Sequence, residues 1–415
     1  MYSRRCFSIV SIILLCAGSA CSTTTTEWPQ WGGPNRNFMV ASTGLADSWP
    51  QDGPRRLWKR ELGDGFSTIV TDSSRLYTMY RTDEEEFVVA LDAATGETIW
   101  EHKTPSPFTE LMAAYGPGPH STPLLVGHRL FTIGTNMMMA CLDKRSGKVI
   151  WQHDLVEEYG AEVPGRGYAC SPLAYKNTVI LPVGGKEGQT FMAFRQDDGA
   201  LVWKKQDFKL SYSSPIIITF EGEDQLVAFM GKGIVGLNPN NGDLLWTHTH
   251  ETNYGANIAT PLWTGDGLLF LSAAYNSGSR VLRLKKENGK TVPEELWYGR
   301  KMRIHHGNAI RIGDYVYGSS GDSGPALFAA VNIKTGEVAW RKRGFAKATC
   351  VYADGKTILL DEDGQLALLT VTPEGMEVHS KCQVAERTSW AAPTLAGTTL
   401  YIRDRKNITA FDLSR

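Results

Sequence analysis

Short apolar runs separated by polar turn residues recur along almost the whole chain. One pair is clear where Phe87–Leu91 is followed by a polar turn and then by Thr98–Trp100. Short apolar runs bounded by Gly, Asp or Asn are typical of β-strands. Further runs of this kind lie at residues 130–133, 178–181 and 268–271. Helical periodicity is missing, so the pattern predicts an all-β chain.

Tryptophan marks the end of a repeated unit. It recurs at intervals of 42 to 52 residues, as Trp58, Trp100, Trp151, Trp203, Trp246, Trp297 and Trp340. In five of these seven cases a Gly stands four residues earlier, as Gly96 does before Trp100, and a small residue such as Ala90 precedes that Gly. Gly suits a tight turn, and a small residue leaves room for an indole on the neighbouring strand. We therefore expect each indole to lie across a turn and seal one unit against the next.

Each unit also begins with a Ser/Thr-Pro signature before an apolar strand, as at Ser121–Leu125. Four short strands per unit make one blade of a β-propeller. Six units end at Trp, a seventh ends at His379, and the C-terminus supplies three strands of an eighth. The strand around Trp58 supplies the missing fourth. The sequence therefore predicts an eight-bladed β-propeller over residues 53–415, with four-stranded antiparallel blades and no free edge.

The unit that ends at Trp297 departs from the pattern. Its Gly289 stands eight residues before the Trp, and Arg283 takes the place of the small residue. This blade should therefore carry a longer outer hairpin and a poorer seal.

The first residues have the composition of an export signal. Arg4 and Arg5 precede an apolar run that ends in small residues at Ala20. This arrangement predicts a signal peptide over residues 1–20, by the general or the twin-arginine route. Cys21 and the Ser/Thr run after it resemble a lipoprotein signal with a flexible tether, which predicts lipid attachment at Cys21; ordinary cleavage after Ala20 is the alternative. Residues 21–52 would then form a tether and an N-terminal strap.

Charge and cysteine content narrow the function classes. The formal net charge is −1 and no basic run is present, which argues against nucleic acid and against a membrane contact other than a lipid anchor. The cysteines beyond the signal region are Cys141, Cys170, Cys350 and Cys382. They are far apart in sequence, their pairing cannot be deduced, and buried single thiols are the favoured interpretation. A closed propeller of this kind is expected to be monomeric.

The repeat from Ala90 to Trp100 resembles the tryptophan-docking repeat of propellers related to pyrroloquinoline quinone (PQQ) enzymes. Residues Trp28–Arg36 also look like the opening of PQQ-like repeat proteins of the cell envelope. Two branches share this fold: the quinoprotein alcohol dehydrogenases, and BamB-type outer-membrane assembly lipoproteins, which are non-enzymatic scaffolds.

The resemblance implies different site residues for the two branches. The dehydrogenases hold PQQ with an adjacent Cys–Cys ring, a Trp under the quinone and a Ca²⁺ ligated by Glu and Asn. No two Cys are adjacent here, and no haem motif is present. The resemblance therefore favours an exported scaffold or binding protein, periplasmic or anchored to the outer membrane, with envelope proteins as partners and with no catalytic residue, metal or cofactor. The alternatives are a quinoprotein dehydrogenase and a propeller that binds a small molecule or glycan.

Propellers bind ligands at the mouth of the central channel, where the innermost strands begin. The polar and aromatic candidates there are His120, Ser171, Ser214, Asn257, His305, His306, Asn308 and Trp390. Ser before Pro is also an ordinary strand-entry signal, and any channel needs a polar lining. If His305 and His306 lie in an extended strand, they face opposite sides and cannot share a metal.

Residues 80–86 and 105–119 are predicted to be loops between strands. The second of these contains several apolar residues in an irregular stretch. It is expected either to fold back over the ring or to form a hydrophobic partner surface.

Overall fold

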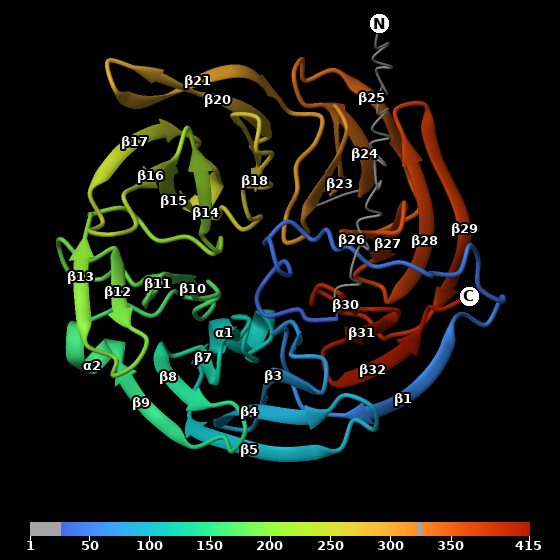
Figure 1. Cartoon of the computed structure of the whole chain (residues 1–415), viewed down its shortest axis with the longest axis horizontal. Coiled ribbons are helices and arrows are strands. Elements are labelled where there is room, and N and C mark those ends of the chain that lie inside the picture. The colour runs from blue at the N-terminus through green and yellow to red at the C-terminus, as the bar shows by residue number, and fades with distance from the viewer. Residues whose placement is uncertain (1–25, 322–325) are drawn as a thin grey trace, which may run out of the picture.

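Eight four-stranded antiparallel sheets form a ring in the computed structural model, which describes residues 26–321 and 326–415 (Figure 1). The strands of the first four blades are β2 (Val70–Thr71), β3 (Arg75–Thr82), β4 (Glu85–Asp92) and β5 (Thr98–Pro105); β6 (Leu124–Val126), β7 (Arg129–Ile133), β8 (Met138–Asp143) and β9 (Val149–Asp154); β10 (Leu173–Tyr175), β11 (Thr178–Pro182), β12 (Phe191–Arg195) and β13 (Leu201–Lys205); β14 (Ile216–Phe220), β15 (Glu223–Met230), β16 (Gly233–Leu237) and β17 (Leu244–Thr249).

The remaining blades are built in the same way. Their strands are β18 (Leu262–Trp263), β19 (Leu268–Ser272), β20 (Ser279–Glu287) and β21 (Lys290–Gly299); β22 (Ala309–Ile312), β23 (Tyr315–Ser320), β24 (Leu327–Asn332) and β25 (Val338–Lys342); β26 (Thr349–Ala353), β27 (Lys356–Leu360), β28 (Gln365–Thr372) and β29 (Gly375–Gln383); and β30 (Thr394–Ala396), β31 (Thr399–Arg403), β32 (Asn407–Asp412) and β1 (Arg55–Glu61). The predicted closure of blade eight by the N-terminal strand is confirmed, since Trp58 pairs with Ala410.

The described helices are short. They are α1 (Glu110–Tyr115), α2 (Leu155–Tyr159) and the 3₁₀ turn η1 (Asn253–Gly255). Among the described residues, none of the helices has the length and apolarity that a bilayer crossing requires.

The indoles lie where the repeat predicts, opposite a small residue and over the turn of the next blade. Trp203 pairs with Ala193 across its own blade, and its Nε1 donates to the carbonyl of Pro239 in the following blade (3.3 Å). A β-bulge follows the small residue in each of these pairs, as it does between Ala193 and Phe194. The added twist of a bulge turns the outer strand toward the next blade.

Two blades lack this arrangement on one side: the fifth blade, and the seventh, where His379 takes the place of the indole. The longer outer hairpin predicted for the fifth blade is confirmed in β20 and β21, but Val281, not Arg283, opposes Trp297. The expectation that Arg283 takes the place of the small residue opposite the indole is wrong, because in the longer hairpin Arg283 pairs with Glu294 and lies farther from Trp297 along the strand. Trp297 itself still donates to Ile333 of the next blade; the seal that changes is the one made by Trp246.

Two predictions about loops also need correction. Residues 80–86 are not a loop, because β3 continues to Thr82 and β4 begins at Glu85, leaving a turn at Asp83 with a φ of 48°. Residues 105–119 contain α1, whose N-cap Thr109 accepts a hydrogen bond from the backbone of Met112. A helix this short presents too few turns for its periodicity to be seen in sequence. It lies near the middle of the ring (Figure 1).

Candidate functional site at the channel mouth

The N-terminal segment closes one end of the central channel. Trp28 is fully buried and forms a β-bridge with Thr71 at the end of β2, and the amide of Leu125 in β6 donates to the carbonyl of Pro29. The segment therefore lies across the ends of the innermost strands, and Figure 1 shows it passing through the middle of the ring toward the C-terminal blades.

Arg36 fixes this segment from inside. It is 7% exposed, and its guanidinium donates to the carbonyl oxygens of Ser171 and Pro172 at 3.2 to 3.5 Å. Burial lowers the pKa of Arg36 to about 9. The side chain still carries its charge at neutral pH, and the carbonyl dipoles take the place of a carboxylate partner.

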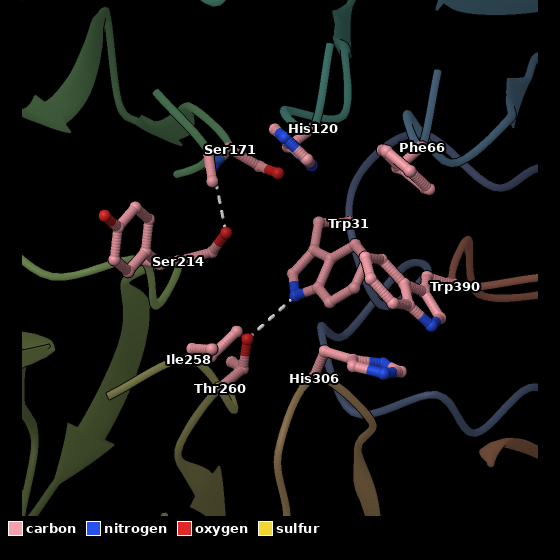
Figure 2. Close-up of a pocket in the computed structure, with 11 residues that line it drawn as sticks. Trp31, Phe66, His120, Ser171, Ser214, Ile258, Thr260, His306 and Trp390 are labelled. Carbon is pink, nitrogen blue, oxygen red and sulfur yellow. Dashed lines mark hydrogen bonds between the residues drawn. The ribbon is translucent and has the colours of Figure 1, made fainter. Parts of the chain in front are cut away.

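Trp31 lies inside the channel and forms the base of a cavity. Its Nε1 donates to Thr260 Oγ1 (2.8 Å). Figure 2 shows it surrounded by side chains from several blades. The cavity has a volume of about 110 Å³ and is lined by Trp31, Phe66, His120, Ala169, Ser171, Tyr212, Ser214, Ile258, Thr260, His306 and Trp390. We call it the inner lobe.

Aromatic rings follow one another along one wall of the inner lobe. His120 stacks on Phe66 with centroids 5.0 Å apart, and Phe66 stacks on Trp390 at 5.1 Å. Trp390 then contacts the ring of His306 at 4.8 Å. These residues come from segments that enter different blades, so the ring closure of the propeller brings them together.

The two imidazoles of the inner lobe are neutral at pH 7. Burial lowers the pKa of His120 to about 4. Burial, together with His305 and Lys347 nearby, holds the pKa of His306 well below its ordinary value. Neither ring nitrogen of His306 has a hydrogen-bond partner among the described residues. A neutral imidazole offers one donor and one acceptor, so this ring can bind a ligand that both gives and receives a hydrogen bond.

A second cavity of about 130 Å³, the outer lobe, adjoins the first and shares six lining residues with it, among them His306 and Trp390. Its further lining includes Tyr115 of α1, Arg166 and Tyr275. The guanidinium of Arg166 stacks over the ring of Tyr115 at 4.5 Å. The outer lobe is thus aromatic with one cationic group.

The structure places the sequence candidates in two groups. Most line the two lobes: His120, Ser171, Ser214, His305, His306 and Trp390. Asn257 and Asn308 line neither lobe. Asn257 Nδ2 donates to the carbonyl of Met230, and Asn308 bonds both backbone groups of Cys350, so these amides hold neighbouring segments together.

The two serines join adjacent blades. The amide of Thr122 donates to Ser171 Oγ, and the amide of Ser171 donates to Ser214 Oγ (2.9 Å; Figure 2). Their hydroxyl oxygens therefore already accept hydrogen bonds that join neighbouring blades of the propeller.

The two adjacent histidines depart from the extended arrangement considered for them. His305 and His306 lie in a bend, with ring centroids 5.0 Å apart, and both line the outer lobe. His305 Nε2 also contacts the hydroxyl of Tyr275 (2.7 Å). Within the described part of the chain, no three His, Cys, Asp or Glu side chains come together as a metal site.

A sequence profile of the family described as outer membrane protein assembly factor BamB matches residues 84–342 and 277–415, which together make up most of the chain. The chain belongs to the BamB family. BamB of Shewanella oneidensis is 22% identical over 287 residues, which cover 64% of this chain and 67% of that protein.

This BamB-family chain also resembles quinoprotein enzymes. The quinoprotein alcohol dehydrogenase PedH of Pseudomonas putida is 29% identical over 198 residues, but the match covers 43% of this chain and only 29% of that enzyme. The quinohemoprotein alcohol dehydrogenase of Comamonas testosteroni has a TM-score of 0.64 at 12% identity, covering 95% of this chain and 81% of that one. At this identity the likeness shows a shared fold.

The channel residues of this BamB-family chain do not fit a PQQ site. Neither lobe has Asp, Glu or Cys in its lining, so neither offers carboxylate ligands for Ca²⁺ or a disulfide ring for the quinone. The four described cysteines are buried free thiols. The inner lobe, at about 110 Å³, is also smaller than the roughly 300–1,000 Å³ typical of sites for larger ligands.

Several residues of the site were not found from the sequence. Phe66 and Arg166 carry no motif that points to the channel. Thr260 stands before Pro261 in the same strand-entry signature as Ser171 and Ser214, but it was not among the candidates. A signal was present for Trp31, because the segment Trp28–Arg36 is rich in Trp and Gly. Nothing in its spacing relates it to the blade repeat, so its place inside the ring could not be deduced.

Proposed function

We propose that this chain is an exported, non-enzymatic scaffold or binding protein of the bacterial cell envelope, and that it acts as a monomeric propeller. Membership of the BamB family is the observation that carries the proposal. The N-terminal segment supports it, because Trp31 lies inside the channel and takes up space that a large cofactor would need.

The surface proposed to bind an envelope protein lies at the open mouth of the channel. Large apolar side chains are exposed there on and before α1, where Phe108, Leu111 and Tyr115 are 39%, 50% and 46% exposed. We infer that the partner presents an apolar segment to this surface, since exposed apolar groups gathered on one element mark interaction sites.

The segment that carries these side chains is anchored to the first blade at its start, and Met112 of α1 is buried. Arg81 donates to Ser106 Oγ (3.0 Å) and forms an ion pair with Glu86 (2.9 Å), and both charged side chains are almost fully buried. The guanidinium also lies 4.9 Å from the ring centroid of Phe108. A rigid surface binds with a smaller loss of conformational freedom than a mobile one.

Photo-crosslinking in cells tests the partner proposal. A photoreactive residue at Leu111 should give a discrete adduct with one envelope protein. Leu244 is a matched control, because it is 46% exposed on the outer strand β17, away from the mouth. The same adducts from both positions, or none from Leu111, would contradict the proposal.

The proposed location rests on the signal region, which lies outside the described residues. We propose cleavage after the signal peptide of residues 1–20 and lipid attachment at Cys21, with residues 21–52 as tether and strap. Replacing Cys21→Ser should release the protein from the membrane fraction into the periplasm. If the Cys21→Ser protein stays with the membrane, the anchor proposal is wrong.

The second candidate is a quinoprotein dehydrogenase, favoured by the 29% identical stretch shared with PedH. Incubating the purified chain with PQQ and Ca²⁺ and following dye reduction by primary alcohols distinguishes the two. We expect no turnover above that of a heat-denatured sample. Sustained turnover would replace the scaffold proposal with this one.

A further inference from the structure

The two lobes contain polar atoms that the protein leaves without partners. Both ring nitrogens of His306, which lines both lobes, are buried and make no hydrogen bond to the described residues. The Nε of Arg166 also lacks a partner, although the half-buried guanidinium lies over the ring of Tyr115. Arg166 also has no carboxylate within ion-pair distance in the described part of the chain. Buried polar groups are nearly always paired, so the imidazole of His306 points to a ligand or to ordered water in the lobes.

The remaining lining restricts what such a ligand can be. Phe66, Trp390 and Trp31 present flat apolar surfaces to the inner lobe, while His306 offers a donor and an acceptor. A ligand that satisfies both needs an apolar face and polar groups around its edge. A hydroxylated six-membered ring has this form, whereas an unsubstituted aromatic ring would leave the imidazole unpaired.

Charge adds a second restriction. Arg166 is the only cationic residue in the lining of the two lobes, which contains no carboxylate, and the two inner imidazoles are neutral. The site therefore favours a ligand that carries a negative charge near Arg166, and it disfavours a cationic ligand. Arginine binds a carboxylate in a planar, two-point arrangement.

We propose that the channel mouth binds an acidic sugar: a pyranose ring packs against Trp31, Phe66 and Trp390 in the inner lobe, and its carboxylate pairs with Arg166 in the outer lobe. Both lobes are small, about 110 and 130 Å³, so a chain of several sugar units would not fit within them. The sugar site shares Tyr115 with the proposed partner surface, but sugar binding and the Leu111 crosslink are measured separately and can fail separately.

Titration of the purified chain carrying Cys21→Ser with single sugars tests the proposal directly. D-glucuronate should bind, as seen by ligand-observed saturation transfer and calorimetry, and D-glucose should bind at least tenfold more weakly because it lacks the carboxylate. Benzoate, which has the charge without the hydroxyl edge, should compete poorly. Absence of glucuronate binding at millimolar concentration, or stronger binding of benzoate, would overturn the proposal.

Two substitutions separate the charge from the ring. Arg166→Gln should weaken glucuronate binding about tenfold and leave glucose binding unchanged. His306→Phe keeps an aromatic ring but removes its nitrogens, and it should weaken both sugars. Arg341→Gln is the matched control, since Arg341 is exposed on the outer strand β25. Equal effects of Arg166→Gln and Arg341→Gln on glucuronate would contradict the role of Arg166.

Discussion

At the scale of single residues, the tryptophan of one blade rests on the turn glycine of the next. A Cβ added to Gly242 would lie 2.7 Å from the ring of Trp203, and Gly96 stands in the same relation to Trp58. Glycine is therefore required at position 242 for two reasons: its φ is positive, at 74°, and the indole of Trp203 leaves no room for a Cβ. This explains why the spacing of Gly and Trp identifies the fold so clearly in sequence.

A comparison of Gly242 with Gly289 distinguishes the effect of the positive φ from the effect of the indole contact. Gly242 and Gly289 have almost the same φ, 74° and 77°, but a Cβ on Gly289 would meet nothing within 4 Å. Both alanine substitutions should suffer the strain of the left-handed backbone, while only Gly242→Ala also displaces an indole. We expect Gly242→Ala to lower the free energy of unfolding by ~1–3 kcal/mol more than Gly289→Ala in urea titrations. Equal losses would show that the indole contact contributes nothing.

A buried histidine makes stability depend on pH. His250 Nδ1 accepts from Arg280 Nε (2.8 Å), and Nε2 contacts Ser277 Oγ (2.9 Å), so the folded site holds a neutral ring. Burial, with the charge of Arg280 beside it, lowers the pKa of His250 to about 3. The unfolded chain binds the proton near pH 6.5, so stability is complete above that pH and is lost as the pH falls toward 3.

The expected size of this effect can be measured with His250→Gln, which does not titrate. Between pH 7 and pH 5 the wild-type protein should lose about 2 kcal/mol more of its unfolding free energy than the variant does. Urea midpoints at the two pH values provide the measurement. The same loss in both proteins would assign the acid sensitivity to other groups.

At the scale of elements, other contacts replace the usual packing of an indole on a turn glycine at two places, between blades four and five and at blade seven. The indole of Trp246 has no turn glycine of the fifth blade beneath it, and it donates to Gln225 Oε1 of its own blade (2.7 Å). Gln225 Nε2 in turn donates to Thr291 Oγ1 of the long hairpin (2.8 Å). In blade seven the N-terminal strap performs this role, because the amide of Trp49 donates to Ser380 Oγ beside His379.

The relay through Gln225 predicts a graded loss of stability. Gln225→Leu leaves both Trp246 Nε1 and Thr291 Oγ1 without their partners and should lower the unfolding free energy by ~2–4 kcal/mol. Thr291→Val removes only the outer partner and should lower it by about 1 kcal/mol. The double variant should be no less stable than Gln225→Leu alone, as shown by urea unfolding. Additive losses would mean that the two contacts are independent.

At the scale of the whole molecule, the sequence predicts the ring but not what lies inside it. Each blade repeats the same local chemistry, so seven indoles and a few turn residues were enough to predict eight blades and their closure through Trp58. The site depends on residues that occur once. Trp31 reaches the channel because the strap lies across the ends of the innermost strands. Arg166 reaches the outer lobe from a loop. Neither placement has a periodic signal.

Closure of the ring by β1 predicts a difference between two equivalent indoles. Trp58 Nε1 donates to Ala93, and Trp100 Nε1 donates to Lys144, both at 3.1 Å. Trp100 lies on β5, which a short turn joins to its neighbour β4. Trp58 lies on β1, which pairs with β32 at the other end of the chain. Holding two distant segments together costs more conformational entropy than holding a hairpin, so β1 depends more on its indole.

Hydrogen exchange followed by mass spectrometry measures this difference. In Trp58→Ala, the amides of β32 should exchange at least tenfold faster than in the wild-type protein, because β1 detaches from its edge. In Trp100→Ala, they should exchange at the wild-type rate, although the total loss of indole contacts is similar. If β32 exchanges at the same rate in both variants, the N-terminal strand is held by its backbone pairing and the strap alone, and the closing indole adds no more than any other seal.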